Sequence, residues 1–366
     1  MRISQRIRRA IFPVRRRINS WRFPRLRSGG PPTGTFSESK ALKSNKVQGE
    51  ILPKLQGYPL IPEDSEIRKA GLRQEAFSGW EMLRSTRNNA YLAAPSLAHC
   101  DDEGRVCREA IYGPHAWADP VWGRQGPVPT QKLSGNFTSI VSRWNEGSNY
   151  FHWFMDGLTR LAHLNSFPAD CRIIIPENPA PFALRSIELL GLTDRVLQVG
   201  DVDLEIERYW FAGPTMLSGC PDPIGVDWLR RKFLTGPQPL GCRKIYIERT
   251  APTRNVGNAQ ELRELFHERG WEIIDPGSLT LDEQISTFRE AKAIAGAHGA
   301  AMTNLLWAPA GTEVLEFMPE RRRNGCYAGI AIIAGQNHQT LVCNSDRKGN
   351  MNIALDKIAC WTDTLR

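Results

Sequence analysis

Residues 293–318 constrain the fold more than any other part of the chain, because they compress two strands, a glycine turn and a short helix into one unit. An apolar run leads into Gly296 and Gly299, a helix is expected to begin near Ala300, and a second strand leads to Glu316. Glycines let the backbone come close to an anion, and a helix start directs unpaired N–H groups toward it. A carboxylate at the end of the second strand can accept hydrogen bonds from ribose hydroxyls. The layout predicts a nucleotide-binding unit.

The glycine pattern of this turn argues against a nicotinamide-dependent enzyme. A dinucleotide-binding loop needs Gly-x-Gly-x-x-Gly, but His298 and Ala301 stand at the second and third glycine positions. An imidazole in the turn can donate a hydrogen bond to a phosphate or to a departing diphosphate. The alternative is an ordinary crossover in which backbone groups bind the loop histidine.

The positive charge of the chain is concentrated at its N-terminal end. The formal net charge is +8, and residues 1–27 hold ten arginines and no acidic residue. Without these ten, the 47 basic residues become 37 against 39 acidic ones, so the body is close to neutral. The basicity therefore belongs to an arm, and no nucleic-acid partner is predicted.

Residues 1–27 also carry an apolar stripe among the arginines. Isoleucine, valine and tryptophan recur at spacings of three and four, which predicts a basic amphipathic helix that contacts an anionic membrane surface. A disordered basic tail and a targeting peptide are the alternatives. Since the sequence has neither a spanning segment nor a secretory signal, we expect a cytoplasmic protein that is peripheral on the inner face of the membrane. The eight scattered cysteines are expected to be reduced thiols.

Composition divides the chain into five parts. Residues 1–27 form the arm, 28–46 are rich in Gly, Pro, Ser and Thr and predict a flexible linker, and residues 346–366 form a C-terminal segment. Between them, we expect an acceptor-side α/β domain at 47–235 and a nucleotide-binding domain at 236–345, with the boundary marked by Pro237 and Pro239. Residues 47–133 show no clear order of elements.

Strand and helix patterns alternate through most of the remaining chain. Strands are predicted at 137–144, 171–175, 195–199, 244–247, 271–274 and 293–297, and helices at 149–164, 181–190, 227–234, 258–269 and 281–291. Such alternation favours parallel sheets covered by helices. Ligands of such sheets bind at the carboxyl ends of the strands, so we expect the ligand in a cleft between two doubly wound domains.

His152 and Asp156 are the first candidate catalytic pair. They lie four residues apart, so on a helix they share one face, and Arg160 extends that face. The carboxylate can orient the imidazole or can itself accept a proton from a hydroxyl. A packing hydrogen bond on an aromatic-rich helix is the alternative.

Arg249 and Arg254 are candidates for binding phosphate. They follow a predicted strand, and two guanidinium groups can neutralise a leaving diphosphate without a metal. A solvated charged loop is the alternative. Asn258 is predicted to cap the next helix, with Glu261 completing a capping box.

Other motifs exclude several enzyme classes. The sequence has no Gly-x-x-x-x-Gly-Lys-Ser/Thr, Gly-x-Ser-x-Gly or His-Glu-x-x-His motif, which argues against P-loop NTPases, common hydrolases and zinc proteases. Asp201 and Asp203 form an Asp-x-Asp sequence after Gly200, which we expect to be a solvated loop without a metal.

Three ordered blocks resemble glycosyltransferase family 61, the group often labelled capsular polysaccharide biosynthesis proteins. The blocks are Asn-Tyr-Phe-His-Trp-Phe-Met-Asp at 149–156, Tyr-Ile-Glu-Arg at 246–249 with Arg254, and Gly-Ala-His-Gly-Ala at 296–300 leading to Glu316. The resemblance covers about residues 134–320 and implies a GT-B arrangement of two facing Rossmann-like domains with a cleft between them. It also implies inversion at the anomeric carbon without a metal or other cofactor.

Carried over by position, the resemblance implies a nucleoside-diphosphate sugar as donor, with a UDP-sugar favoured. Arg249, Arg254, His298, Gly299 and Asn304 are implied donor contacts, and Glu316 an implied ribose contact. Residues His152 and Asp156 are the implied acceptor-side pair.

The expected reaction moves the sugar to a glycan or lipid-linked saccharide hydroxyl in capsular or cell-surface polysaccharide biosynthesis. Asp156, alone or through His152, would remove the proton. Two alternatives remain: a non-catalytic glycan- or nucleotide-binding component of a polysaccharide assembly, and a nicotinamide-dependent sugar oxidoreductase.

Overall fold

The computed structural model describes residues 34–44, 46–51, 83–100, 105–110, 130–142, 144, 147–213, 221–249 and 254–365. The basic arm at 1–27 and its predicted amphipathic helix lie outside these residues. The described part divides into two compact units. The N-terminal unit comprises the described residues up to 183 together with 191–213, and the C-terminal unit comprises 184–190 and those from 221 onward.

The N-terminal unit is built on a mixed sheet, not on the purely parallel sheet that the alternation predicted. Strands β6, β7 and β8 are parallel and β9 runs parallel to β6, but β3 pairs antiparallel with β9, β2 and β4. The described order is β1-β5-β4-β3-β9-β6-β7-β8, with β2 also on β3. The strands are β1 (Gly34–Phe36), β2 (Gln48–Ile51), β3 (Leu83–Ala93), β4 (Ala98–Cys100), β5 (Arg105–Cys107), β6 (Thr130–Ser139), β7 (Arg172–Pro176), β8 (Val196–Val199) and β9 (Asp203–Ala212).

Among the described residues, the first strand and helix lie inside the segment that the sequence predicted as a linker. Strand β1 pairs with β5, and helix α2 (Glu38–Lys43) follows directly. The hydroxyl of Ser37 accepts a hydrogen bond from the backbone N–H of Lys40 at 3.3 Å, which caps this helix. Residues 34–44 of the predicted linker are therefore part of the fold, and Ser37 serves there as a helix cap.

The helical segment after β6 changes its winding twice. One α turn, α5 (Tyr150–His152), passes into a π-helical turn, η4 (Trp153–Gly157), and then into the 3-10 segment η5 (Leu158–Ser166). The predicted position of this helix is confirmed, but it is not α-helical throughout. Trp153 and Phe154 are both fully buried although they are neighbours, so the segment packs on two sides. Helix α6 (Pro181–Leu189) and the short η6 (Thr193–Arg195) follow β7.

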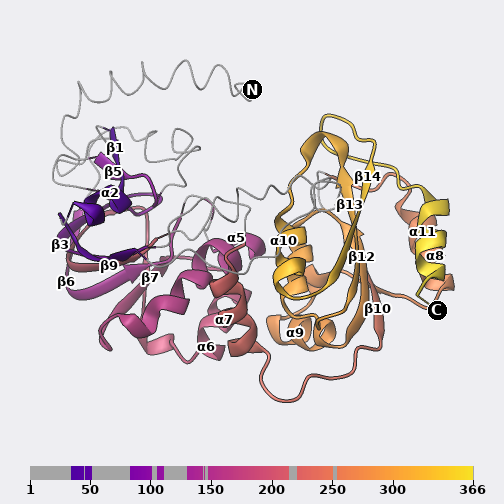
Figure 1. Ribbon diagram of the computed structural model, residues 1–366, viewed down its shortest axis with the longest axis horizontal. Helices are drawn as coiled ribbons and strands as arrows, with labels where there is room; N and C mark the ends of the chain where they lie inside the picture. Colours follow the sequence, from indigo (N-terminus) through magenta and orange to yellow (C-terminus); the bar gives the residue numbers. More distant parts are fainter. Residues whose placement is uncertain are drawn as a thin grey trace. The chain divides into compact units, whose positions relative to one another are not determined.

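The C-terminal unit is a doubly wound α/β fold with a five-stranded parallel sheet (Figure 1). The strands are β10 (Arg243–Ile247), β11 (Glu272–Ile274), β12 (Ala291–Ala297), β13 (Glu313–Pro319) and β14 (Asn337–Cys343), in the order β11-β10-β12-β13-β14. From β10 the chain first adds β11 on one side of that strand, and it then adds β12, β13 and β14 on the other side. In such sheets the topological switch point lies between the two strands where the direction changes, here β10 and β12.

Helices cover both faces of this sheet (Figure 1). On one face, Ala295 and Phe317 pack with Phe266 and Ile358 in a core formed with α8 (Ala259–Glu268) and α11 (Leu355–Asp363). On the other face lie α7, α9, α10 and the 3-10 segment η8, which contact one another. Their bounds are Pro223–Phe233 for α7, Leu281–Arg289 for α9, Cys326–Ile333 for α10 and Ala300–Leu306 for η8; the short segments η7 (Pro276–Ser278) and η9 (Glu320–Arg322) lie in connections.

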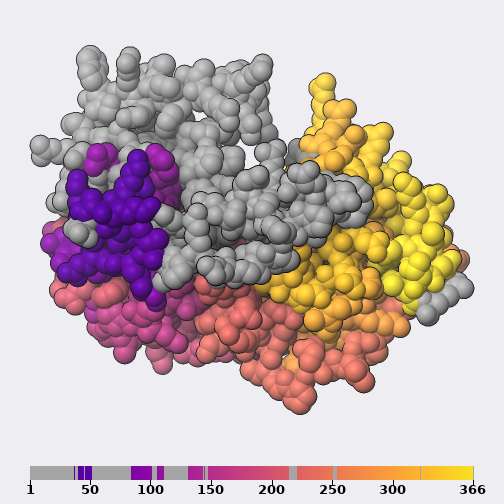
Figure 2. Space-filling view, in the orientation of Figure 1, coloured from indigo at the N-terminus to yellow at the C-terminus, as the bar shows by residue number. Residues whose placement is uncertain are grey.

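The C-terminal unit extends beyond both of its predicted boundaries. Helix α7 belongs to it, because Nη1 of Arg230 donates to the backbone oxygens of Leu306 and Ala308 at 2.6 and 2.9 Å. At the other end, Trp361 of α11 lies 5.4 Å from Trp271, ring centroid to ring centroid. Residues 346–365 thus join the surface of this unit in place of a separate segment (Figure 2).

Two further properties concern the described residues alone. None of their helices combines the length and the apolar character needed to cross a bilayer. Their seven cysteines are all free thiols.

Candidate functional site

Two loops at the switch point of the C-terminal unit carry most of the predicted donor-binding residues. Arg249 and Arg254 follow β10, and His298 and Gly299 follow β12. Ile247 and Gly296, near the ends of these strands, are cross-strand partners, so the two loops leave the sheet next to each other. The structure therefore brings these four residues to the edge where doubly wound sheets bind ligands.

The half-buried guanidinium of Arg249 lies against the backbone of Gly299. A Cβ at position 299 would collide with Nη1 of Arg249. Burial lowers the pKa of Arg249, and the positive charge of Arg254 lowers it further. Two cationic groups close enough to repel each other are stabilised by an anion placed between them.

Arg254 is held in a left-handed backbone conformation. Its φ angle is 60°, which L-residues other than glycine rarely adopt and which costs about 1 kcal/mol or more. The next residue fixes this turn: the N–H of Asn255 donates to Oδ1 of Asn350 at 3.0 Å, and its carbonyl oxygen accepts from the N–H of Met351 at 2.9 Å. The loop that carries Arg254 is thus pinned to the segment before α11.

His298 is bonded to a buried carboxylate. Its Nδ1 lies 2.5 Å from Oε1 of Glu316, and Oε2 of Glu316 lies 3.0 Å from Nε2 of His338. Burial by itself would raise the pKa of Glu316, but the hydrogen bonds and charges of His298 and His338 outweigh it and lower the pKa to about 2. Glu316 is therefore ionised at neutral pH.

Glu316 is not placed as the sequence predicted. It lies in the middle of β13, not at its end, and 0% of it is exposed. Both carboxylate oxygens are bonded to imidazoles, which favours a role in holding His298 over contact with a ribose. The sequence prediction missed His338 entirely. It lies in β14, a strand that the sequence reading did not predict.

Tyr327 in α10 is a second residue that the sequence prediction missed. Its ring centroid lies 4.9 Å from that of His298, on which it packs at a tilt. Burial raises the pKa of the Tyr327 phenol well above its usual value; Glu316 adds to this shift, whereas Arg254 and Arg249 oppose it. These three charged groups are therefore within electrostatic reach of one phenol.

Gly296 and Asn304, on either side of the glycine turn, have packing roles. Gly296 lies within β12, and a Cβ there would stand 3.0 Å from Cβ of Ile247 and 3.1 Å from Sδ of Met302. The glycine therefore makes room for Met302. Asn304 is 0% exposed and its side-chain amide donates to Oε1 of Gln284 at 2.9 Å, which ties η8 to α9.

Asn258 occupies the predicted N-cap position without capping the helix through its side chain. Its Nδ2 donates to the backbone oxygen of Ile353 at 2.9 Å, and its Oδ1 accepts from the N–H of the same residue at 2.9 Å. The capping box with Glu261 is therefore absent. The side chain of Asn258 binds Ile353, which is distant in the sequence, in place of the first turn of its own helix.

In the N-terminal unit, His152 and Asp156 form the predicted pair. Nδ1 of His152 lies 2.6 Å from Oδ2 of Asp156, across the start of the π-helical turn. The side chain of Asp156 is 6% exposed and that of His152 20%. The ring of Trp144 is stacked on that of His152, with centroids 5.6 Å apart and planes inclined by 15°. Trp144, which is 38% exposed, was not predicted as a site residue.

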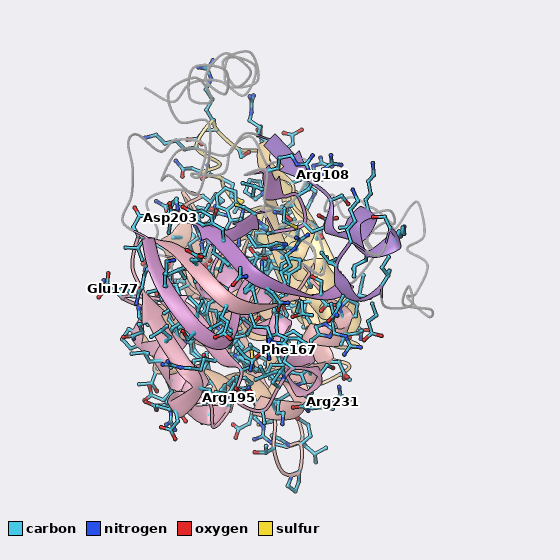
Figure 3. The ribbon with its side chains drawn as sticks, turned by 90° about the vertical axis from the view of Figure 1, so that its left-hand side faces the viewer. Arg108, Phe167, Glu177, Arg195, Asp203 and Arg231 are labelled. Atoms are coloured by element: carbon cyan, nitrogen blue, oxygen red, sulfur yellow. The ribbon has the colours of Figure 1, made fainter. Side chains whose placement is uncertain are left out.

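Only part of the Asp-x-Asp sequence is the solvated loop that we expected, because Asp201 is exposed in a bend whereas Asp203 is not. Asp203 starts β9 (Figure 3) and is fully buried. Its carboxylate accepts from the hydroxyl of Tyr91 at 2.5 Å and from the N–H of Ala94 at 3.0 Å. It therefore links β9 to the end of β3. Within the described ranges, no group of three or more His, Cys, Asp and Glu residues could hold a metal ion.

Comparison with known proteins identifies one family. No curated protein matches the chain. The family described as Glycosyltransferase 61 matches residues 150–315, a range that includes His152, Asp156, Arg249, Arg254 and His298. Glu316, Tyr327 and His338 follow the matched range. Residues 150–315 are therefore similar to the family Glycosyltransferase 61, and the resemblance noted in the sequence is confirmed over this range.

Proposed function

We propose that the chain is an inverting, metal-independent glycosyltransferase that uses a nucleoside-diphosphate sugar. A UDP-sugar is the favoured donor, and the acceptor is a hydroxyl of a glycan or a lipid-linked saccharide in capsular or cell-surface polysaccharide biosynthesis. The observation that carries the proposal is the cationic cluster of Arg249 and Arg254 beside Gly299, at the switch point of a doubly wound unit.

The cationic cluster suits a diphosphate for three reasons. Guanidinium groups form paired hydrogen bonds with phosphate oxygens and keep their charge at all physiological pH values. The repulsion between Arg249 and Arg254 is relieved when an anion binds between them. His298, held through Nδ1, keeps Nε2 for a further hydrogen bond. Together these groups would stabilise the negative charge that develops on the leaving diphosphate.

On the acceptor side, His152 is the better candidate for the proton acceptor. Because Asp156 is almost fully buried, its carboxylate is less accessible to a hydroxyl than the imidazole is. The bond between Nδ1 and Asp156 orients the ring and leaves Nε2 for the acceptor hydroxyl. In a single displacement, the deprotonated oxygen attacks the anomeric carbon as the diphosphate leaves. We therefore propose His152 as the general base and Asp156 as the residue that orients it.

Binding is tested first, by thermal shift with UDP, GDP, CDP and their sugars. A nucleotide that binds the native state stabilises it by mass action, about 2.7 kcal/mol at a hundred times its dissociation constant. We expect Arg249→Gln and Arg254→Gln to abolish most of the shift. Arg231→Gln is the matched control, because Arg231 is an exposed arginine paired with Asp227 on α7. An equal shift in all three variants contradicts the proposed donor site.

Transfer is tested by release of nucleoside diphosphate in the presence of saccharide acceptors. We expect His298→Ala to remove most of the release while the protein remains folded. Parental release by a folded His298→Ala protein contradicts the role of this residue. Nucleotide binding without release, with every acceptor class tested, would identify the chain as a non-catalytic binding component.

A further inference from the structure

We infer that Glu316 and His338 are positioning residues that lock the ring of His298, so that Nδ1 is always the bonded nitrogen and Nε2 is the one presented to a ligand. The inference rests on the proposed function only for the identity of that ligand, the donor diphosphate. Neither Glu316 nor His338 touches substrate in this assignment.

The two short contacts of Glu316 determine which nitrogens carry protons. An ionised carboxylate can only accept hydrogen bonds, so both imidazoles must donate to it. Nδ1 of His298 and Nε2 of His338 therefore carry hydrogens. Fixing one nitrogen in this way sets the tautomer and the orientation of the ring, as carboxylates do for histidines that bind metals.

The strand register places His338 beside Glu316. Glu316 is the cross-strand partner of Thr340, and His338 lies two residues earlier on the same face of β14. Its side chain is fully buried, and its Nδ1 has no hydrogen-bond partner. A buried polar nitrogen without a partner is destabilising, and an apolar ring would avoid that cost. The bond from Nε2 to Glu316 is the contact that accounts for a histidine at this position.

The surroundings of His298 make a fixed ring necessary. Arg249 lies over Gly299, the next residue, and the charge of Arg254 reaches Arg249. Tyr327 packs on the ring from α10. With Glu316 bonded to two rings, neither oxygen is left to turn toward the arginines and neutralise them.

Thr340 provides a matched control on the same strand. It is buried, directly opposite Glu316, and its hydroxyl has no hydrogen-bond partner. Thr340→Val therefore alters β14 next to Glu316 without removing a hydrogen bond to Glu316. A purely structural effect of altering β14 would appear in this variant as well.

The test uses the full chain labelled with ¹⁵N-histidine, without any sugar donor. We expect the signals of His298, assigned by their absence in His298→Asn, to show a proton fixed on Nδ1. In His338→Phe and in Glu316→Gln these signals should move toward a mixture of tautomers, while Thr340→Val leaves them unchanged. Unchanged His298 signals in both folded variants would overturn the inference. Because this NMR measurement needs no catalysis, its result is independent of the proposed transfer reaction.

Steady-state kinetics provide a second test of the inference. We expect His338→Phe to lower kcat about tenfold, a usual size for loss of an outer-shell partner. The KM for the donor should change little, because no ligand contact is lost. His338→Gln, whose amide can donate to Glu316, should retain most of the rate. A folded His338→Phe with parental kcat, or a Thr340→Val with an equal loss, contradicts the positioning role.

Discussion

The guanidinium of Arg249 fills the space beside Gly299 that a side chain at residue 299 would need. This relationship couples the loop after β10 to the turn after β12, across the switch point of the sheet. Gly299 is extended, with φ at 175°, so its backbone does not require glycine. The glycine is needed for the space it leaves to Arg249.

Gly299→Ala should therefore impair donor binding without unfolding the protein. The new methyl group meets the end of a flexible side chain, which can turn away, so the free energy of unfolding should change by less than about 1 kcal/mol. The displaced guanidinium should weaken nucleotide binding about tenfold, measured as the dissociation constant by titration calorimetry.

A double-mutant cycle shows whether this loss acts through Arg249. If it does, adding Gly299→Ala to Arg249→Gln should produce no further loss of nucleotide affinity, because the displaced group is already gone. Fully additive losses would show that the methyl group acts on the ligand directly.

Trp144 should be required for acceptor chemistry but not for donor binding. Its indole is stacked on His152, and Trp144→Leu removes this contact, so the imidazole loses one of its constraints. We expect a lower kcat with acceptor and an unchanged nucleotide dissociation constant. Trp144→Phe keeps a stacking ring and should retain most of the rate. If the Leu and Phe variants lose activity equally, stacking is not the relevant contact.

The C-terminal unit could be predicted from the sequence because local patterns determine it. Its apolar strands and the amphipathic helices α8 and α9 follow each other with clear periodicity, so a parallel sheet was predicted correctly. Residues after β10 and β12 meet because parallel strands end at one edge. That rule alone placed Arg249 and His298 together.

Long-range partners account for what the sequence did not predict. Asn258 binds the backbone of Ile353 and Asp203 binds Tyr91, and neither partner is near in the chain. His338 meets Glu316 only through the register of β13 and β14. In the N-terminal unit, antiparallel pairing of β3 with β9 joins segments separated by more than one hundred residues. No local pattern encodes such pairings.

Deletion of residues 1–27 should lower sedimentation with vesicles rich in anionic phosphatidylglycerol. The arm holds ten arginines and no acidic residue, and each basic side chain near an anionic surface contributes about 1 kcal/mol. The deleted protein should keep its thermal shift with nucleotide. Binding of the full chain should fall at high salt and be weak with neutral vesicles. Equal sedimentation of the two proteins with anionic vesicles contradicts a membrane role for the arm.

His163 should make the protein less stable in mild acid. Burial lowers its pKa to about 4; the charge of Arg84 lowers it further and that of Glu50 opposes this. An unfolded histidine has a pKa of about 6.5, so between these values the unfolded chain binds a proton that the native chain does not. The free energy of unfolding should fall by about 2–3 kcal/mol from pH 7.5 to 4.5 through this residue. Urea unfolding of His163→Gln should show a smaller fall than the parent. Equal falls would mean that His163 is protonated in the folded protein.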